Sequence, residues 1–173
     1  MSSDDINRII NAVNLYALAT DTQRWELFDL VFTPDVEADY GPGIHWHDIA
    51  SFKRDFAAIH GPLDASQHVV TNHQVDVKGD CAHAFSYVVG RLMRHMPEGG
   101  ADFLQSGGWY DDTLVRTPSG WRIQKRVCRS IWFEGNPRVL ETMPGAKVKP
   151  QSTTLRREAE AGNLAYVKAL AAR

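Results

Sequence analysis

The fold is decided by the stretch from residue 15 to residue 35, LYALATDTQRWELFDLVFTPD. It begins as the end of an amphipathic helix and is interrupted at residues 20–22, where Thr-Asp-Thr leaves the helical pattern. It then resumes as a short apolar helix around Trp25 and Phe28, which Pro34 is expected to end. The stretch therefore predicts two helices with a break between them, each with an apolar side that must pack against another layer.

The break places Asp21 in a position that allows two interpretations. Thr and Asp side chains accept hydrogen bonds from the free amides at a helix start, so Asp21 is the expected N-cap of the second helix. The other interpretation is chemical, because Tyr16 lies five residues upstream and large apolar side chains surround both residues. A carboxylate beside an apolar pocket is a place where the pKa of a proton-transferring group is readily shifted.

The overall composition is that of one globular domain with no electrostatic signal for nucleic acid. The chain has 173 residues, of which 43% are hydrophobic, and a formal net charge of -2 with acidic and basic residues mixed. Its first ten residues are acidic and polar, unlike a signal peptide, and no apolar run reaches membrane-spanning length. Cys81 and Cys128 show neither metal-ligand spacing nor a disulfide framework. We therefore expect a cytoplasmic protein that binds neither nucleic acid nor a membrane.

The N-terminal third is predicted to be mainly helical. Apolar residues recur at helical spacing from residue 4 to residue 19, which predicts one amphipathic helix. Residues 36–40 are short and β-prone, and the Gly-Pro-Gly sequence that follows ends them. Asp48 is placed to cap a third helix, which Gly61 and the proline after it end.

From residue 67 onwards the chain is rich in β-branched and aromatic residues, with turn sequences between the segments. The predicted strands are residues 67–77, 82–96, 103–116 and 121–133. Short connections join antiparallel neighbours, so these strands are expected to form a meander. Three helices followed by four long antiparallel strands predict an α+β domain, with the helices packed on one face of a curved sheet.

The C-terminal part differs in composition from the rest. Residues 135–150 contain three prolines and two glycines with little apolar periodicity, which predicts an arm that crosses the surface. Residues 154–172 are predicted to form one more helix with a weak apolar face. We expect the domain to span residues 1–134, and the arm and helix to occupy residues 135–173.

Seven histidines are present, and two patterns among them bear on function. His45-Trp46-His47 is half of a metal-binding motif, but the glutamate and third ligand that the motif needs are absent, so we expect surface histidines and no metal site. His68 and His73 lie in one predicted strand at positions of opposite parity. Simple alternation puts His73 on the apolar face, whereas a β-bulge between them reverses this for one of the two. The sequence pattern leaves both alternatives open.

Three motifs together resemble a known family. They are an Asp after the first helix, Gln-His-x-x-x-Asn at residues 67–72, and Gly-Trp-Arg-Ile-Gln-Lys-Arg at residues 120–126. In this order they resemble the SnoaL-like branch of the NTF2-like superfamily, over about residues 4–134. Within that branch the order is similar to scytalone dehydratase, hexachlorocyclohexane dehydrochlorinase and the bile-acid 7α-dehydratases. The resemblance implies a cone-shaped α+β barrel.

The resemblance also implies a catalytic site, because these enzymes use an Asp–His dyad in an apolar cavity. Matched motif to motif, their Asp falls on Asp21 and their His falls on His68. The Tyr of the bile-acid enzymes falls on Tyr16, and the arginine of the last strand falls on Arg126, with Arg129 as the alternative. A neutral imidazole is a base near working pH, and a carboxylate behind it fixes its tautomer. The resemblance assigns hydrogen bonding of the leaving group to the tyrosine and stabilisation of negative charge to the arginine.

These parts predict a cofactor-independent lyase, of dehydratase or dehydrohalogenase type, that acts on an apolar cyclic small molecule. The sequence contains no phosphate-binding loop, dinucleotide fingerprint or metal-ligand set, so no cofactor is expected. The expected substrate is steroid-, polyketide- or halocarbon-like. The alternatives are an isomerase or polyketide cyclase on the same scaffold, and a non-catalytic ligand-binding or dioxygenase small-subunit-like protein. We also expect a homo-oligomer that covers the outer face of the sheet, and the resemblance favours a trimer.

The substrate-binding side chains are expected among the large apolar residues. Aromatic residues at helical or strand spacing are mostly ordinary core, so only part of the predicted set should reach a ligand. The predicted set is Trp25, Phe28, Tyr40, Phe52, Phe56, Tyr87, Trp109 and Trp132.

Overall fold

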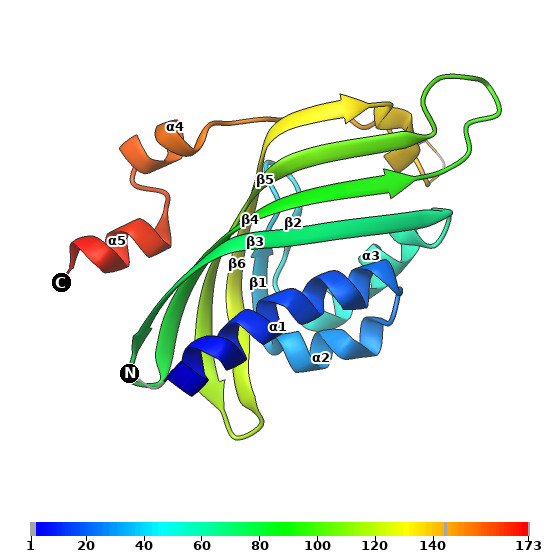
Figure 1. Ribbon diagram of the computed structural model, residues 1–173. Coiled ribbons are helices and arrows are strands. Elements are labelled where there is room, and N and C mark those ends of the chain that lie inside the picture. The colour runs from blue at the N-terminus through cyan, green and yellow to red at the C-terminus, as the bar shows by residue number, and fades with distance from the viewer. Residues whose placement is uncertain (1–2, 144, 173) are drawn as a thin grey trace.

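A curved six-stranded sheet holds the N-terminal helices against its inner face (Figure 1). The computed structural model describes residues 3–143 and 145–172. The strands are β1 (Phe32–Asp39), β2 (His45–Trp46), β3 (Ala65–Lys78), β4 (Cys81–Met93), β5 (Phe103–Thr117) and β6 (Gly120–Gly135). Their order is β2-β1-β6-β5-β4-β3, and neighbours are antiparallel except for β1 and β6, which run parallel. The predicted α+β architecture is confirmed, with a sheet that curls but does not close.

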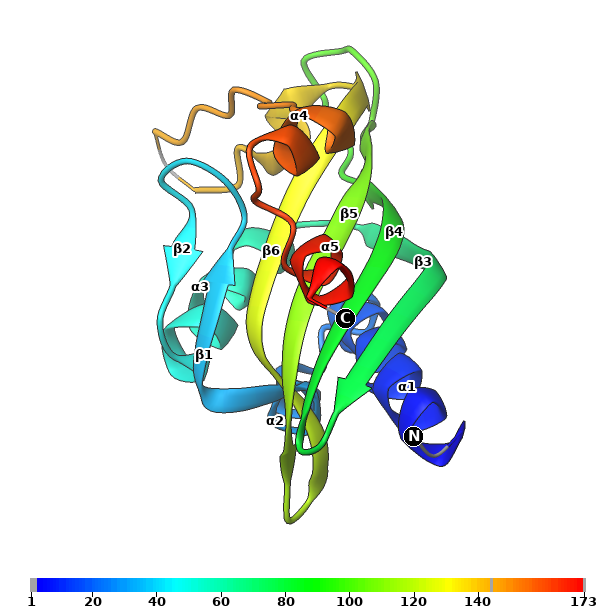
Figure 2. The ribbon, with the colours of Figure 1, turned by 90° about the vertical axis from the view of Figure 1, so that its left-hand side faces the viewer.

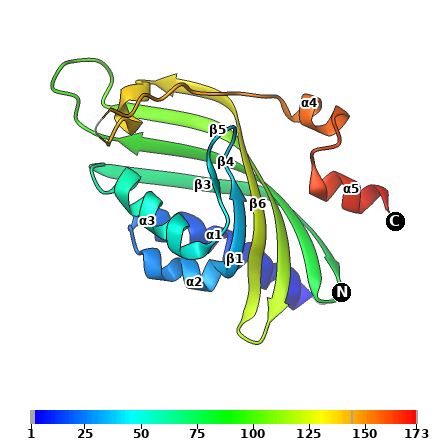
Figure 3. The same cartoon turned by 180° about the vertical axis from the view of Figure 1, so that it is seen from behind.

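The N-terminal helices form a layer across the concave side of the sheet (Figure 3). They are α1 (Ser3–Asp21), the 3-10 turn η1 (Trp25–Leu27), α2 (Phe28–Val31) and α3 (Ile49–His60). As predicted, Asp48 caps α3, because its Oδ1 accepts a hydrogen bond from the amide of Ser51 at 2.7 Å. Within the described residues, none of the helices has both the length and the apolarity that crossing a bilayer requires.

Pro34 does not end the second helix, as the sequence pattern suggested, but lies inside β1. Helix α2 is only four residues long, and the chain is extended from Phe32 onwards. A proline is tolerated here because the pairing of β1 with β6 is irregular between Phe32 and Glu37, so the missing amide leaves no regular ladder bond unmade.

The main core lies between the helices and the inner face of the sheet, and it is rich in aromatic rings. Phe28 and Phe52 are fully buried, and their ring centroids are 5.3 Å apart. Phe56 contacts Phe52 edge to face at 4.6 Å, a favoured geometry for aromatic pairs. Burying each such side chain stabilises the fold by roughly 1.5–3 kcal/mol, so this cluster fixes α3 on the sheet.

The C-terminal segment lies on the opposite, convex side of the sheet (Figure 2). The single helix predicted for residues 154–172 is wrong, because two short helices, α4 (Leu155–Glu160) and α5 (Ala165–Ala171), occupy this region. Gly162 has a φ of 69°, a left-handed conformation that ends the first of them. Before α4, the arm contains the 3-10 turn η2 (Pro137–Leu140), whose Val139 is fully buried.

Candidate functional site

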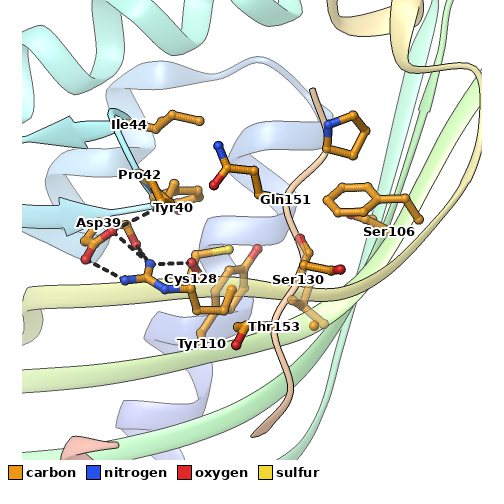
Figure 4. Close-up of a pocket in the computed structure, with 18 of the residues that line it drawn as sticks. Asp39, Tyr40, Pro42, Ile44, Ser106, Tyr110, Cys128, Ser130, Gln151 and Thr153 are labelled. Atoms are coloured by element: carbon orange, nitrogen blue, oxygen red, sulfur yellow. Dashed lines mark hydrogen bonds and ion pairs between the residues drawn. The ribbon is translucent and has the colours of Figure 1, made fainter. Parts of the chain in front are cut away.

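A cavity of about 800 Å³ opens between the helices, the inner face of the sheet and the C-terminal arm. Its wall is mostly apolar, with a few polar side chains that converge on it, which is the usual form of a small-molecule site. The arm contributes residues 148–153 to the mouth. Figure 4 shows Gln151 and Thr153 of this arm near Tyr40, Cys128 and Ser130. The other wall residues used below are Tyr16, Phe56, Ile59, His60, His68, Gly90, Leu92, Tyr110, Arg129 and Leu140.

Asp21 and His68 meet at the edge of this cavity, although they are 47 residues apart in the chain. Asp21 is the last residue of α1, and its Oδ1 lies 2.6 Å from His68 Nδ1. Its carboxylate also accepts the amide of His68 at 2.7 Å and the hydroxyl of Ser66 at 2.9 Å. The N-cap interpretation of Asp21 is therefore wrong, and no side chain caps η1 or α2.

A β-bulge brings His68 to the inner face of the sheet. The pairing of β3 with β4 shifts register between Thr71 and Gln74, and Asn72 has a left-handed φ of 54°. One extra residue reverses the parity of the strand, so His68 and His73 both face inward. His73 lies deeper along the strand, where its Nδ1 is 2.8 Å from Ser86 Oγ, and it does not line the cavity.

The geometry of the pair determines the tautomer of His68. Burial alone would raise the pKa of the Asp21 carboxyl, but the hydrogen bonds and charge of His68, with that of Ser66, outweigh it and hold the pKa below its usual value. An ionised carboxylate only accepts hydrogen bonds, so Nδ1 of His68 carries the proton. Nε2 then keeps its lone pair, and it has no partner in the described part of the chain. The free acceptor nitrogen of His68 therefore belongs to a ring that lines the cavity.

Two tyrosine hydroxyls form a polar spot beside the dyad. Tyr16 Oη and Tyr40 Oη are 3.0 Å apart, and the ring of Tyr110 meets that of Tyr16 edge to face at 5.5 Å. Burial raises the pKa of each of the three phenols, most strongly for Tyr40 and Tyr110. They therefore stay neutral and act as hydrogen-bond donors or acceptors, not as phenolates.

Arg126 lies behind these tyrosines and not on the cavity wall. It is fully buried, and Asp112 accepts two hydrogen bonds from it, at 2.8 Å from Nε and 2.7 Å from Nη2. Its guanidinium stacks 4.0 Å from the ring centre of Tyr110 and 4.4 Å from that of Tyr16. Burial opposes the charge, but Asp112 keeps the pKa of Arg126 well above its ordinary value, so the group is a permanent cation.

Of the two arginines considered for the site, the one that reaches the cavity is Arg129, at the mouth. It is tied to Asp39 at the end of β1, with Nη2 2.7 Å from Oδ2 and Nη1 2.8 Å from Oδ1. The two arginines differ in position because β1 ends at Asp39, next to Arg129, whose side chain extends past the end of that strand. Arg126 lies within the paired region of the sheet, and its side chain pairs with Asp112 of the neighbouring strand β5.

The predicted aromatic residues separate into three groups. Tyr40 and Phe56 line the cavity, as predicted. Phe28 and Phe52 are fully buried core residues behind the wall, and Trp25 packs edge-on against Phe28 at 5.5 Å. Their helical spacing places them one layer below the cavity surface, where they support the wall without reaching a ligand.

Tyr87, Trp109 and Trp132 are on the other side of the sheet, so their prediction as cavity residues is corrected. Side chains alternate along a strand, and in β4 and β5 the neighbouring Val88 and Tyr110 take the inward positions. Tyr87 and Trp132 are 37% and 40% exposed on the convex face. Trp109 is fully buried there under Leu164.

Most of the cavity wall was not among the predicted site residues, and two of these residues, His60 and Cys128, carry titratable side chains. His60 is 6% exposed, and burial lowers its pKa to about 4, so it lines the cavity as a neutral ring. Burial raises the pKa of Cys128 to about 12, so its thiol is not a nucleophile. Phe52, Phe56 and His60 are spaced four residues apart, so helical periodicity could have placed His60 on the buried side of α3. Nothing in the sequence marked Cys128.

The described residues contain no cluster of three or more potential metal ligands. His45 lies in β2, is partly exposed and has its Nδ1 3.4 Å from Asp39 Oδ1, while His47 follows it on the surface. The two histidines of the His45-Trp46-His47 motif therefore lie at the surface, in and just after β2.

Known proteins share this sequence pattern and this fold. The SnoaL-like domain family matches residues 1–127 of the chain. An uncharacterised protein of Mycobacterium tuberculosis is 36% identical over 118 residues, which cover 65% of this chain and 76% of that protein.

Two solved structures illustrate the fold. A Novosphingobium aromaticivorans protein, provisionally assigned as a scytalone dehydratase, has a TM-score of 0.69 at 19% identity, covering 86% of this chain and 94% of its own. A hexachlorocyclohexane dehydrochlorinase of type 2 has a TM-score of 0.64 at 12% identity, covering 87% and 94%. Likeness at these identities shows the fold alone. The family match over residues 1–127 establishes that the chain belongs to the SnoaL-like domain family.

Proposed function

We propose that this protein is a cofactor-independent lyase that eliminates hydroxide or halide from an apolar cyclic small molecule. The observation that carries the proposal is the His68 imidazole on the wall of an apolar cavity, with Nδ1 held 2.6 Å from the Asp21 carboxylate. The dehydratase and dehydrochlorinase assignments of the two fold neighbours support the same reaction class.

In the proposed step, Nε2 of His68 removes a proton from carbon. The C–H electron pair becomes the new carbon–carbon double bond, and the leaving group departs from the adjacent carbon with its bonding pair. Asp21 stabilises the imidazolium that forms, and the imidazolium then returns its proton to the departed hydroxide or to solvent. The reaction is redox-neutral, so the side chains present suffice for it.

The tyrosines and the buried arginine have supporting roles in this proposal. Tyr16 is neutral because burial raises its pKa, so it hydrogen-bonds the leaving oxygen or a carbonyl oxygen where charge develops. Arg126 does not touch the substrate and acts through the rings above it, where its charge stabilises a more negative hydroxyl on Tyr16 or Tyr110.

One observation favours a second candidate, an isomerase. The paired hydroxyls of Tyr16 and Tyr40, 3.0 Å apart, form a site that suits an enolate oxygen. A base that removes a proton beside a carbonyl and returns it to another carbon would use the same residues. The two reactions differ in outcome, because elimination releases water or halide and isomerisation conserves the composition of the substrate.

The experiment is turnover of cyclic β-hydroxyketones and chlorocyclohexanes in deuterated water, followed by mass spectrometry. His68→Ala is expected to lower the rate by a factor of about 10²–10⁴, the range that a general base contributes. Asp21→Asn should retain part of the activity, because the base itself survives. His73→Ala is the matched control, since it removes an inward-facing histidine of the same strand that does not line the cavity.

A His68→Ala protein that turns substrate over at the rate of the wild type would refute the lyase and the isomerase together. If the product contains deuterium but has lost neither water nor halide, the enzyme is an isomerase instead.

A further inference from the structure

His60 occupies a distinct position on the cavity wall, at the C-terminal end of α3. Its ring stacks on Phe56 at a centroid distance of 5.0 Å and an interplanar angle of 25°, and the ring of Trp25 lies 5.6 Å away. Its backbone oxygen accepts a hydrogen bond from Gln23 Nε2 at 3.1 Å, in the loop that follows Asp21. The ring therefore packs on two aromatic side chains, and the backbone of His60 is held by the loop after α1.

The hydrogen bonding of His60 determines which nitrogen is free. Nδ1 lies 2.9 Å from the carbonyl oxygen of Phe56, and a carbonyl only accepts, so Nδ1 carries the proton. Burial lowers the pKa of the ring to about 4, so the imidazole is neutral and Nε2 has a lone pair.

Nε2 of His60 is directed at open space and not at a protein partner. No hydrogen bond to it exists within the described residues, yet it is not among their fully enclosed, unpartnered polar atoms. The ring as a whole borders the cavity, whose wall also contains the apolar side chains of Ile59, Leu92 and Leu140. His60 Nε2 is thus an acceptor on the cavity wall that cannot donate, in addition to His68 Nε2.

We propose that His60 Nε2 accepts a hydrogen bond from a hydroxyl group of the ligand, so that the cavity takes a hydroxylated cyclic molecule and not a halocarbon. This deepens the proposed function, on which it rests for the reaction, by naming the substrate class. A tyrosine hydroxyl donates or accepts as the ligand requires, whereas a neutral imidazole with Nδ1 occupied offers only a lone pair. A ligand without a donor would leave that lone pair buried and unpaired, which is unfavourable.

The site is separate from the dyad, although the two histidines are close enough for the charge of His68 to lower the pKa of His60. His68 is directed by a carboxylate and acts as a base, while His60 is directed by a backbone carbonyl and acts as an acceptor. His60 is therefore a residue that orients and selects the ligand, and it takes no part in proton removal from carbon.

The test compares two probes of similar size, 2-naphthol and 2-methoxynaphthalene, which differ in that only the first is a hydrogen-bond donor. Dissociation constants are measured by calorimetry on the full-length protein and on His60→Phe, which keeps the stacked ring but has no acceptor. The preference for 2-naphthol over 2-methoxynaphthalene, given by the ratio of the two dissociation constants, is expected to be about tenfold larger in the wild type than in His60→Phe. This difference is the effect of one buried hydrogen bond. His60→Gln, which returns an acceptor to the Nε2 position, should restore most of the ratio.

An unchanged ratio in His60→Phe would overturn the proposal. Should that variant fail to fold, His60→Asn gives the same test, because its amide can still donate to the Phe56 carbonyl while leaving no acceptor at the Nε2 position. His68→Ala is expected to leave the ratio within about twofold of the wild type, and a loss of the ratio there would assign the hydroxyl to His68 and refute the role of His60. The protein could also show no lyase activity while His60→Phe still lowers the ratio of the two dissociation constants. That result would refute the proposed reaction and leave the inference about ligand binding in place.

Discussion

At the scale of single residues, the position of His68 depends on the absence of a side chain on the next strand. Gly90 of β4 pairs with His68, and a Cβ placed on it would lie 3.1 Å from Cδ2 and 3.2 Å from Nε2 of the imidazole. Ordinary van der Waals contacts between such atoms are longer, so the ring would have to move. Gly90 thus leaves the room in which the base faces the cavity.

We therefore predict that Gly90→Ala lowers turnover by about tenfold or more, because small displacements of a reacting group are costly. Denaturant titration should show only a small change in stability. The control is the same substitution in a His68→Ala background, where the crowded ring is gone and Gly90→Ala should have no further effect on stability or binding. A wild-type rate in Gly90→Ala would show that the ring has space to spare.

Arg126 gives the second prediction at this scale. The family resemblance implied a cavity residue that stabilises negative charge, but Arg126 is fully buried in an ion pair with Asp112. Arg126→Met should destabilise the fold by about 3–5 kcal/mol, because it leaves a buried carboxylate without its partner. Urea unfolding of Arg126→Met and of the double variant with Asp112→Leu provides the measurement. The double variant should recover much of the stability that Arg126→Met loses. A double variant as unstable as Arg126→Met would contradict this account.

At the scale of elements, helix α5 is attached to the convex face by one buried carboxyl group and a small apolar cluster. Asp111 is 2% exposed, and its oxygens accept the amides of Ala165 at 2.5 Å and Tyr166 at 3.1 Å. Leu164, which precedes the helix, is buried with Phe85 and Trp109. Burial raises the pKa of Asp111 to about 6 even though both amides favour the ionised form.

This attachment predicts a pH dependence with a definite sign. Between about pH 4 and pH 6 the unfolded carboxyl has lost its proton while the folded one keeps it, so the contribution of Asp111 to stability falls as pH rises. The raised pKa of Asp111 in the folded protein corresponds to a loss of about 3 kcal/mol in the free energy of unfolding across this pH range. Asp111→Asn should abolish this loss, as measured by urea unfolding at pH 4 and pH 7. The exposed residue Glu134 provides the control, since Glu134→Gln should leave the pH profile unchanged, and an unchanged profile in Asp111→Asn would refute the assignment.

At the scale of the whole molecule, the convex face of the sheet remains partly uncovered beside α5. The exposed apolar side chains there are Val69, Tyr87 and Trp132, at 46%, 37% and 40% exposure. Apolar groups gathered on one exposed face favour association between copies of a chain. The arm runs over the mouth of its own cavity, where the amide of Thr153 donates to the Ser130 carbonyl at 2.9 Å.

We predict that the protein is a homo-oligomer in solution, with three chains favoured by the family resemblance, and that this face contributes to the contact. Light scattering at micromolar concentration should give the mass of more than one chain. Trp132→Glu should lower that mass, whereas Leu18→Glu, at a 56% exposed position on α1, should not. A monomer at this concentration would refute the prediction.

Local periodicity determined most of the architecture. The amphipathic run after residue 4, the cap at Asp48 and the turns between long β-prone segments are short-range features, so the helices and the four long strands could be predicted from the sequence. The Asp21–His68 contact was expected only through the family resemblance, because no local pattern specifies a contact between residues so far apart. The alternation of side chains along the strand could not determine whether His68 or His73 faces the inner side of the sheet.

The tertiary structure decided which side chains face the cavity. A single bulged residue, Asn72, reverses the parity of β3, and such a reversal is invisible to a period-two pattern. Whether an arginine reaches the cavity depends on where the neighbouring strand ends, which separates Arg129 from Arg126. The curvature of the sheet and the path of the arm make an enclosed site out of residues from both ends of the chain, because enclosure depends on contacts between distant segments and not on the order of residues within one of them.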